Sequence, residues 1–193
     1  MLMEMIRLPA SLERKLTEMF PTIREREKFV ERVIEEALDQ DGNTSMPERI
    51  GGTIHLFTDG GSRGNPGQAA IGIVLIDPAR GEVIREHCER IGIETNNVAE
   101  YRALIEGLKI AGRYHPKSLV CHLDSELIVK QLSGEYRVRM ATLQPLMEEI
   151  QELATQLPSV SFKHIPRDDN WRADELVNKA LDEHPSPTYK REA

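Results

Sequence analysis

The fold of this chain is decided by residues 53–67, TIHLFTDGGSRGNPG. Within this stretch, Ile54–Thr58 is an apolar run with the length and composition of a buried strand. Asp59 ends the run, and four glycines follow among residues 60–67. We interpret these residues as a glycine loop whose bare backbone amides can approach a ligand closely. A nucleotide-phosphate loop is excluded, because no Gly-Lys-Ser/Thr follows and the next element reads as a strand.

The elements after this run follow in an order typical of a mixed α/β sheet. Two strand patterns joined by a short turn suggest an antiparallel hairpin, and apolar stripes then predict helices that alternate with two more strands. The expected elements are strands 69–76 and 82–93, helix 97–113, strand 119–123, helices 125–132 and 142–156, strand 160–165 and helix 170–183.

Residues 1–40 form a separate segment that reads as a short strand followed by two helices. A turn-rich linker, 41–52, joins it to the main body, 53–184, and residues 185–193 read as a flexible tail. About forty residues are too few to bury a core comfortably. The order of elements is similar to ribbon-helix-helix modules, which implies a homodimer through residues 1–40. The alternative is an extension that packs on the body and only stabilises it.

Composition excludes several classes of protein. No apolar stretch is long enough to cross a bilayer, so no membrane association is expected, and the N-terminus lacks the order of a secretion signal. Cys88 and Cys121 lie in strand-like runs and read as small core residues, which makes a reducing, cytoplasmic setting the simplest one. The net charge is −7, of which residues 1–50 carry −3 (8 Lys+Arg against 11 Asp+Glu). Residues 51–193 carry the remaining −4, which would be offset if a metal neutralised four acids. The charge balance therefore permits a nucleic-acid substrate but does not indicate one.

Four carboxylates stand at separate, informative places: Asp59, Glu100, Asp124 and Asp174. Two of them directly follow strands, one opens a helix, and Asp174 shares the apolar face of the last helix. Gathering like charges is costly, because each raises the pKa of the others. A hard divalent cation, which prefers carboxylate oxygen, is the usual reason to do so.

Each acid has a structural alternative when it is taken singly. Asp124 could be the N-cap of the helix at Ser125, and Asp59 could form a turn before its glycines. Glu100 stands three residues after Asn97, the spacing of a capping box. Asp174 is the hardest to explain structurally, since a charge on an apolar face needs a partner or a metal.

Four motifs in this order resemble the type 1 ribonucleases H over roughly residues 53–183. They are FTDGGSRGNPG (57–67), TNNVAEY (95–101), DSEL (124–127) and NWRADEL (170–176). The resemblance implies an α/β ribonuclease H-like fold whose five-stranded mixed sheet has three antiparallel and then two parallel strands. The chain looks most like members that carry a short hook, 131–136, in place of a long basic protrusion.

By this resemblance the enzyme hydrolyses the RNA strand of RNA–DNA hybrids and leaves 5′-phosphate and 3′-hydroxyl ends. Asp59, Glu100, Asp124 and Asp174 are the expected catalytic residues and the ligands of two Mg²⁺ ions, with Mn²⁺ as the alternative metal. RNA is expected to be recognised through its 2′-hydroxyl. The expected substrate-binding residues are Gly60, Gly61, Ser62, Arg63, Asn96, Asn97 and Gln131, although Asn96 and Asn97 could simply cap their helix.

The proton carrier departs from the pattern of the better-known relatives, which place a histidine in the loop before the last helix. His164 has the matching distance from Asp174 but lies in a strand-like run, and the loop itself offers Arg167. Either residue, or neither, could assist proton transfer or product release. Asn170 and Trp171 are expected to cap and pack the last helix. The competing functions are a catalytically silent binding module and another nuclease on the same scaffold.

Overall fold

A computed structural model describes Thr22 and residues 50–183. The chain divides into two compact units, residues 1–46 and 47–193, and all described helices and strands belong to the second. The predictions for residues 1–40, for most of the linker and for the tail at 185–193 lie outside the described residues.

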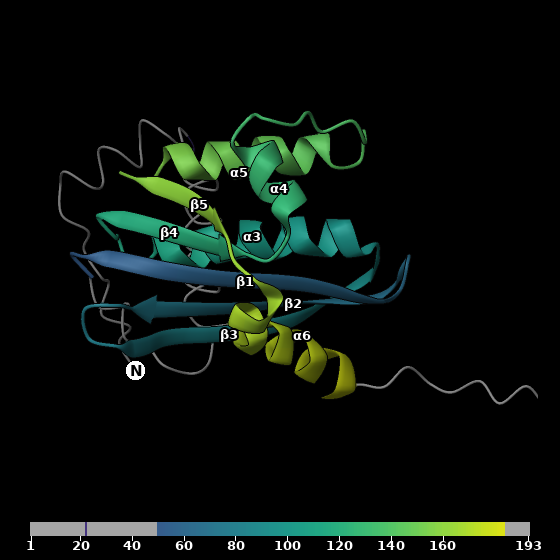
Figure 1. The fold of residues 1–193 in the computed structure, drawn as a ribbon, viewed down its shortest axis with the longest axis horizontal. Helices are drawn as coiled ribbons and strands as arrows, with labels where there is room; N and C mark the ends of the chain where they lie inside the picture. Colours follow the sequence, from purple (N-terminus) through teal and green to yellow (C-terminus); the bar gives the residue numbers. More distant parts are fainter. Residues whose placement is uncertain (1–21, 23–49, 184–193) are drawn as a thin grey trace, which may run out of the picture. The chain divides into compact units, whose positions relative to one another are not determined.

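A five-stranded sheet with the order β3-β2-β1-β4-β5 forms the centre of the second unit (Figure 1). Its first three strands form antiparallel pairs, and β4 and β5 join in parallel, which confirms the predicted mixed sheet. The strands are β1 (Thr53–Gly64), β2 (Gly67–Asp77), β3 (Glu82–Glu94), β4 (Ser118–Leu123) and β5 (Val160–His164).

Helices cover both faces of the sheet. One face packs against α3 (Asn96–Gly112), because alternate residues of β1, such as Ile54 and Leu56, are fully buried against Leu104 and Leu108. The helix α5 (Gln144–Thr155) packs on α3 and adds Ile150 to the same core. The other face carries α6 (Trp171–Glu183), which packs mainly on β2. Two short elements, α4 (Glu126–Leu132) and the 3₁₀ turn η1 (Arg167–Asn170), complete the described fold.

The predicted glycine loop is wrong: β1 continues through it to Gly64, and the strand pairs with β2 as far as Gly64 and Gly67. The glycines serve packing at two positions. A Cβ placed on Gly60 would lie 2.2 Å from the Ala99 carbonyl carbon of α3, and one on Gly72 would lie 2.2 Å from the Ala173 carbonyl oxygen of α6. Only glycine therefore lets both helices approach the strands this closely.

Neither structural alternative for these two acids, a helix cap at Asp124 or a capping box at Glu100, is found. The N-cap of α3 is Thr95, whose hydroxyl accepts from the Val98 N–H at 3.3 Å, so Glu100 lies beyond the capping-box position. The N-cap of α4 is Ser125, so Asp124 is not the capping residue. Neither carboxylate is needed to begin its helix. Among the described residues, no helix has the length and apolarity that a membrane span requires.

Candidate active site

The sheet and two helices bring the four predicted carboxylates toward one another. Asp59 lies within β1 and Asp124 directly after β4, and these strands are parallel neighbours that pair at Phe57 and His122. Asp59 and Asp124, each two positions beyond that pair, therefore lie at the same end of the β1–β4 pairing. The sequence correctly identified the end of β4, whereas it ended β1 six residues too early, at Thr58 instead of Gly64.

The close glycine contacts bring in the other two acids from opposite faces. The contact at Gly60 holds the backbone of Ala99 and Glu100 against β1. Gly72 is the cross-strand partner of Asp59, and its contact with Ala173 brings the first turn of α6 to the same level of the sheet. Glu100 and Asp174 are thus carried to Asp59 by backbone packing.

Burial and mutual repulsion dominate the electrostatics of this cluster. Asp59 is 8% exposed, and its pKa is raised to about 6, first by burial and then by the charges of Asp124 and Asp174. Burial, followed by Asp124 and Asp59, raises the pKa of Glu100 to about 7. Hydrogen bonds from the Gly60 backbone to Asp59 and from the Ser125 side chain to Glu100 act in the opposite direction. Asp59 and Glu100 therefore sense the negative charge of neighbouring acids, as the sequence predicts.

Arg167 is the cation of the cluster. Its Nη2 donates to Asp174 Oδ1 at 2.9 Å, and its positive charge also lowers the pKa of Asp59 and Glu100. The hydrogen bond to Asp174 in turn raises the pKa of Arg167. On the other side of Asp174, the Asn178 Nδ2 donates to Oδ2 at 2.9 Å. Both oxygens of Asp174 thus have protein donors.

The donor set fits a hard divalent cation, since it consists of carboxylate oxygens, and burial followed by neighbouring negative charge raises the pKa of two of them, Asp59 and Glu100. Within residues 50–183, however, no three acidic, histidine or cysteine side chains are already close enough together to hold an ion. Existing hydrogen bonds hold two of the four carboxylates: Arg167 donates to Asp174, and Asn96 Nδ2 donates to Glu100 at 3.2 Å. Binding an ion requires these side chains to turn toward it.

The predicted substrate residues are divided between ordered and exposed positions. Asn96 joins the strand to the helix, since its Oδ1 accepts from the Ser62 N–H at 3.2 Å while its amide reaches Glu100. Asn97 is exposed, and Arg63 is paired with Asp182 of α6. Gln131 lies in α4, and its Oε1 accepts from the Tyr101 hydroxyl at 2.7 Å. Tyr101 is a site-supporting residue that the sequence did not single out, because its apolar ring fitted an ordinary core position.

The two proton-carrier candidates differ in their surroundings. His164 is the last residue of β5 and is exposed, and the described acid on which its charge acts is Glu126, outside the cluster. Arg167 contacts Asp174 directly. Asn170 departs from its predicted capping role: its Nδ2 donates to the Thr58 carbonyl at 3.0 Å, and its Oδ1 accepts no hydrogen bond from a described residue. Trp171 is 61% exposed instead of packed.

Comparison with known proteins identifies the family. Residues 57–180 match the family described as Reverse transcriptase-like. Ribonuclease HI of Halobacterium salinarum is 42% identical over 138 residues, which cover 72% of this chain and 68% of that protein. The bifunctional protein Rv2228c of Mycobacterium tuberculosis is also 42% identical, but the match covers 67% of this chain and only 35% of that protein.

Solved structures agree with the sequence relatives. The RNase H1 structure from Halobacterium salinarum aligns with a TM-score of 0.67 at 41% identity, covering 69% of this chain and all of that one. LC11-RNase H1 in complex with an RNA/DNA hybrid aligns with a TM-score of 0.65 at 43% identity, covering 69% of this chain and 99% of that one. Together with the five-stranded sheet and its cluster of carboxylates, these matches show that the chain belongs to the type 1 ribonuclease H family.

Proposed function

We propose that this protein is an endoribonuclease that hydrolyses the RNA strand of RNA–DNA hybrids with divalent metal ions as cofactors. The observation that carries the proposal is the electrostatic coupling of Asp59, Glu100, Asp124 and Asp174 at one edge of the sheet. A relative at 43% identity, LC11-RNase H1, has been crystallised with an RNA/DNA hybrid, which supports the choice of substrate.

The four carboxylates would hold the metal, with Asp59 as the most buried and central ligand. When bound, two Mg²⁺ or Mn²⁺ ions would supply an activated water and stabilise the leaving 3′ oxygen, which gives 5′-phosphate and 3′-hydroxyl ends. The chain's own contribution is alignment: the rigid strands fix Asp59 and Asp124, and packed helix backbones fix Glu100 and Asp174.

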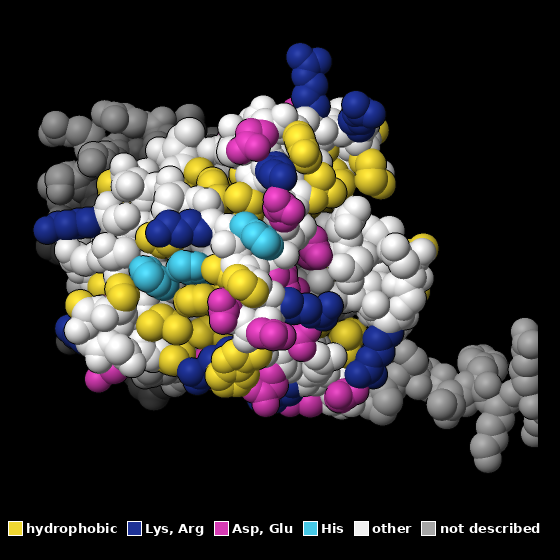
Figure 2. Space-filling model, viewed as in Figure 1, with side chains coloured by type: hydrophobic (Ala, Val, Ile, Leu, Met, Phe, Trp, Pro, Cys, Tyr) yellow, Lys and Arg dark blue, Asp and Glu magenta, His cyan; other side chains and the backbone are white. Residues whose placement is uncertain are grey.

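Recognition of RNA is proposed to use groups around Glu100. Asn96 links Glu100 to the backbone of Ser62 through two hydrogen bonds. The backbone of Gly60–Arg63 and the side chains of Asn96 and Asn97 are proposed to read a 2′-hydroxyl in a shallow minor groove. Gln131 is proposed as a further contact that Tyr101 holds in place. Figure 2 shows acidic side chains with interspersed Lys and Arg on the face that carries α6, so phosphate contacts are expected to be few and sensitive to salt.

Arg167 is the better candidate of the two for assisting proton transfer or product release. It contacts Asp174 and acts electrostatically on three further acids, whereas His164 is exposed at the end of β5. Because a guanidinium stays protonated, Arg167 would act by attracting the phosphate product or the metal-bound carboxylate and not by carrying the proton itself.

We also propose that residues 1–40 mediate a homodimer, on the grounds that a segment of this size needs a partner surface to bury its apolar residues. A reducing cytoplasm is the proposed setting, because Cys88 and Cys121 are both free thiols.

One assay tests the catalytic proposal. A labelled RNA–DNA hybrid, an RNA duplex and a DNA duplex are each incubated with the protein, with and without Mg²⁺. The expected result is cutting of the RNA strand of the hybrid alone, with complete dependence on the metal. Binding without cutting would instead support a silent module, and cutting of all three duplexes would support a different nuclease.

A further inference from the structure

Asn170 makes a buried hydrogen bond that none of the roles above uses. The residue is 1% exposed, and its Nδ2 donates to the Thr58 carbonyl oxygen at 3.0 Å. Its Oδ1 is buried as well and accepts no hydrogen bond from any described residue. A buried amide oxygen without a partner costs folding free energy, so stability alone does not account for an asparagine here.

The bond joins two of the chain segments that supply the proposed active site. Thr58 immediately precedes Asp59 in β1. Asn170 follows Arg167 by three residues and precedes Asp174 by four, at the junction of η1 and α6. One buried side chain thus fixes the distance between the strand that carries Asp59 and the turn that carries Arg167 and Asp174.

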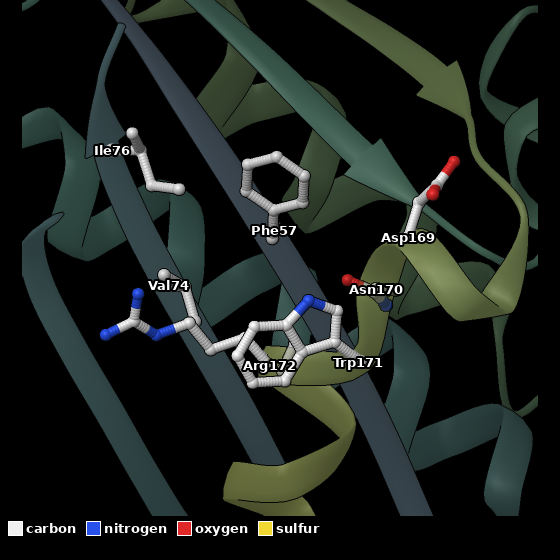
Figure 3. Close-up of a pocket in the computed structure, with 8 residues that line it drawn as sticks. Phe57, Val74, Ile76, Asp169, Asn170, Trp171 and Arg172 are labelled. Carbon is white, nitrogen blue, oxygen red and sulfur yellow. The ribbon is translucent and has the colours of Figure 1, made fainter. Parts of the chain in front are cut away.

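Packing on this side of η1 is incomplete. A pocket of about 150 Å³ lies beside Asn170, lined by Phe57, Val74, Ile76 and Trp171 (Figure 3). A volume of this order is enough for one aromatic ring. Trp171, the residue that could fill it, is 61% exposed. Side-chain packing therefore leaves the η1–α6 junction room to shift, and the hydrogen bond from Asn170 opposes that shift.

We propose that Asn170 is a positioning residue for the active site. It holds the segment 167–174 against β1 so that Asp174 and Arg167 stay in register with Asp59. The Oδ1, which accepts no hydrogen bond within the described part of the chain, is the cost of placing a donor at this point. The inference rests on the proposed metal-dependent function. Asn170 acts through Asp174 and Arg167 and does not itself contact the substrate.

The test is the variant Asn170→Leu, which keeps a similar volume and removes both polar atoms. Stability should change little, because the Thr58 carbonyl loses its donor while the unpaired Oδ1 also disappears. Amide hydrogen exchange across residues 166–174 should become at least about tenfold faster, since local opening is no longer opposed. Mn²⁺ affinity measured by calorimetry should fall about 10-fold, and kcat on a hybrid about 10- to 100-fold, with KM nearly unchanged.

A matched control separates positioning from general stability. Ile150 belongs to α5 and points into the core. Ile150→Val should lower the unfolding temperature, while amide exchange at 166–174 and Mn²⁺ affinity stay as in the natural protein. If Asn170→Leu does not fold, Asn170→Ser is used, because its hydroxyl is too short to reach the Thr58 carbonyl and the same changes are expected.

Unchanged exchange at 166–174, or unchanged Mn²⁺ affinity, in the folded Asn170 variant overturns the proposal. The same holds if Ile150→Val weakens Mn²⁺ binding as much as the Asn170 variant does. Exchange and calorimetry do not depend on hybrid cleavage. A natural protein that binds Mn²⁺ but leaves hybrids intact would therefore overturn the proposed function and still leave the role of Asn170 decided.

Discussion

At the scale of single residues, the proposed active site is a set of charges that the fold holds together against their repulsion. Asp59 and Glu100 have pKa values of about 6 and about 7, raised chiefly by burial, and Arg167 relieves only part of the negative charge. This arrangement makes the cluster receptive to a cation, and it makes the metal-free protein sensitive to pH.

Asp59→Asn should abolish most activity while sparing the fold. The substitution removes the most buried of the expected metal ligands. Hybrid cleavage should therefore fall by more than about 100-fold, which exceeds the loss typical for a residue that only hydrogen-bonds to a metal ligand. The metal-free protein should become more stable, because a buried, repelled charge is gone. Initial rates and urea unfolding with a chelator measure the two effects.

His164→Ala provides the comparison for Asp59→Asn. Its side chain is exposed at the end of β5, so the loss of cleavage should be much smaller. An equal or greater loss would reverse this ranking and assign the proton transfer to His164.

The raised pKa of Glu100 predicts a pH-dependent stability in the absence of metal. Its carboxyl has a pKa of about 7 in the folded chain and an ordinary value of 4.5, so the folded state binds this proton more tightly. The stability it contributes is present below pH 4.5 and is lost as the pH rises toward 7. The free energy of unfolding of the natural protein, minus that of Glu100→Gln, should therefore fall by roughly 2–3 kcal/mol across this range.

Urea unfolding at several pH values with a chelator checks this prediction. Saturating Mn²⁺ is the control, and it should abolish the decline because the ion replaces the proton. If the difference in unfolding free energy between the natural protein and Glu100→Gln rises with pH, the neighbours of Glu100 stabilise its ionised form. That result would contradict the expected effect of burial.

At the scale of elements, helices reach the active site because two strands lack side chains where the helices cross them. Gly60 admits α3 and Gly72 admits α6, on opposite faces of the same pair of strands. The helices therefore deliver Glu100 and Asp174 through contacts between backbones. Such contacts cannot adjust by a change of rotamer, which gives the site its rigidity.

Gly60→Ala should disrupt both the fold and the site. The new methyl group would lie 2.2–2.3 Å from backbone atoms of Ala99 and Glu100, so α3 must move away from β1. A loss of at least about 3 kcal/mol in unfolding free energy is expected, at the upper end of overpacking, together with loss of hybrid cleavage. Thermal unfolding followed by circular dichroism measures the first effect.

Gly52→Ala is the matched control for that substitution. A Cβ there meets nothing within 4 Å, so stability and cleavage should stay close to those of the natural protein. If Gly60→Ala behaved like this control, α3 would not be held as closely to β1 as the structure shows.

At the scale of the whole molecule, a compact catalytic unit accompanies a short N-terminal one. Residues 47–193 contain all five strands of the described sheet, and the Ile50 N–H and the Gly52 carbonyl already bond to Tyr114 and Lys117 of this unit. The catalytic unit should therefore fold and cleave by itself, and residues 1–46 are proposed to serve assembly.

Sedimentation of the full chain and of a chain that begins at Pro47 tests this division. The full chain is expected to sediment as a dimer and the shortened chain as a monomer, with similar kcat per active site in both. A monomeric mass for both forms would remove the dimer, and a shortened chain that fails to fold would show that the first unit stabilises the second.

The sequence by itself determined the order of the elements and the four acids, because hydrophobic periodicity and local motifs are properties of neighbouring residues. It could not separate capping from catalysis at Glu100 and Asp124, since both roles use the same spacing, and it mistook the end of β1 for a loop. Tertiary structure decided the caps and the extent of β1: Thr95 and Ser125 are the N-caps of the two helices, and Gly60 lies within β1 where α3 crosses it. The partner of Asn170, 112 residues away, is likewise a product of long-range packing that no local pattern encodes.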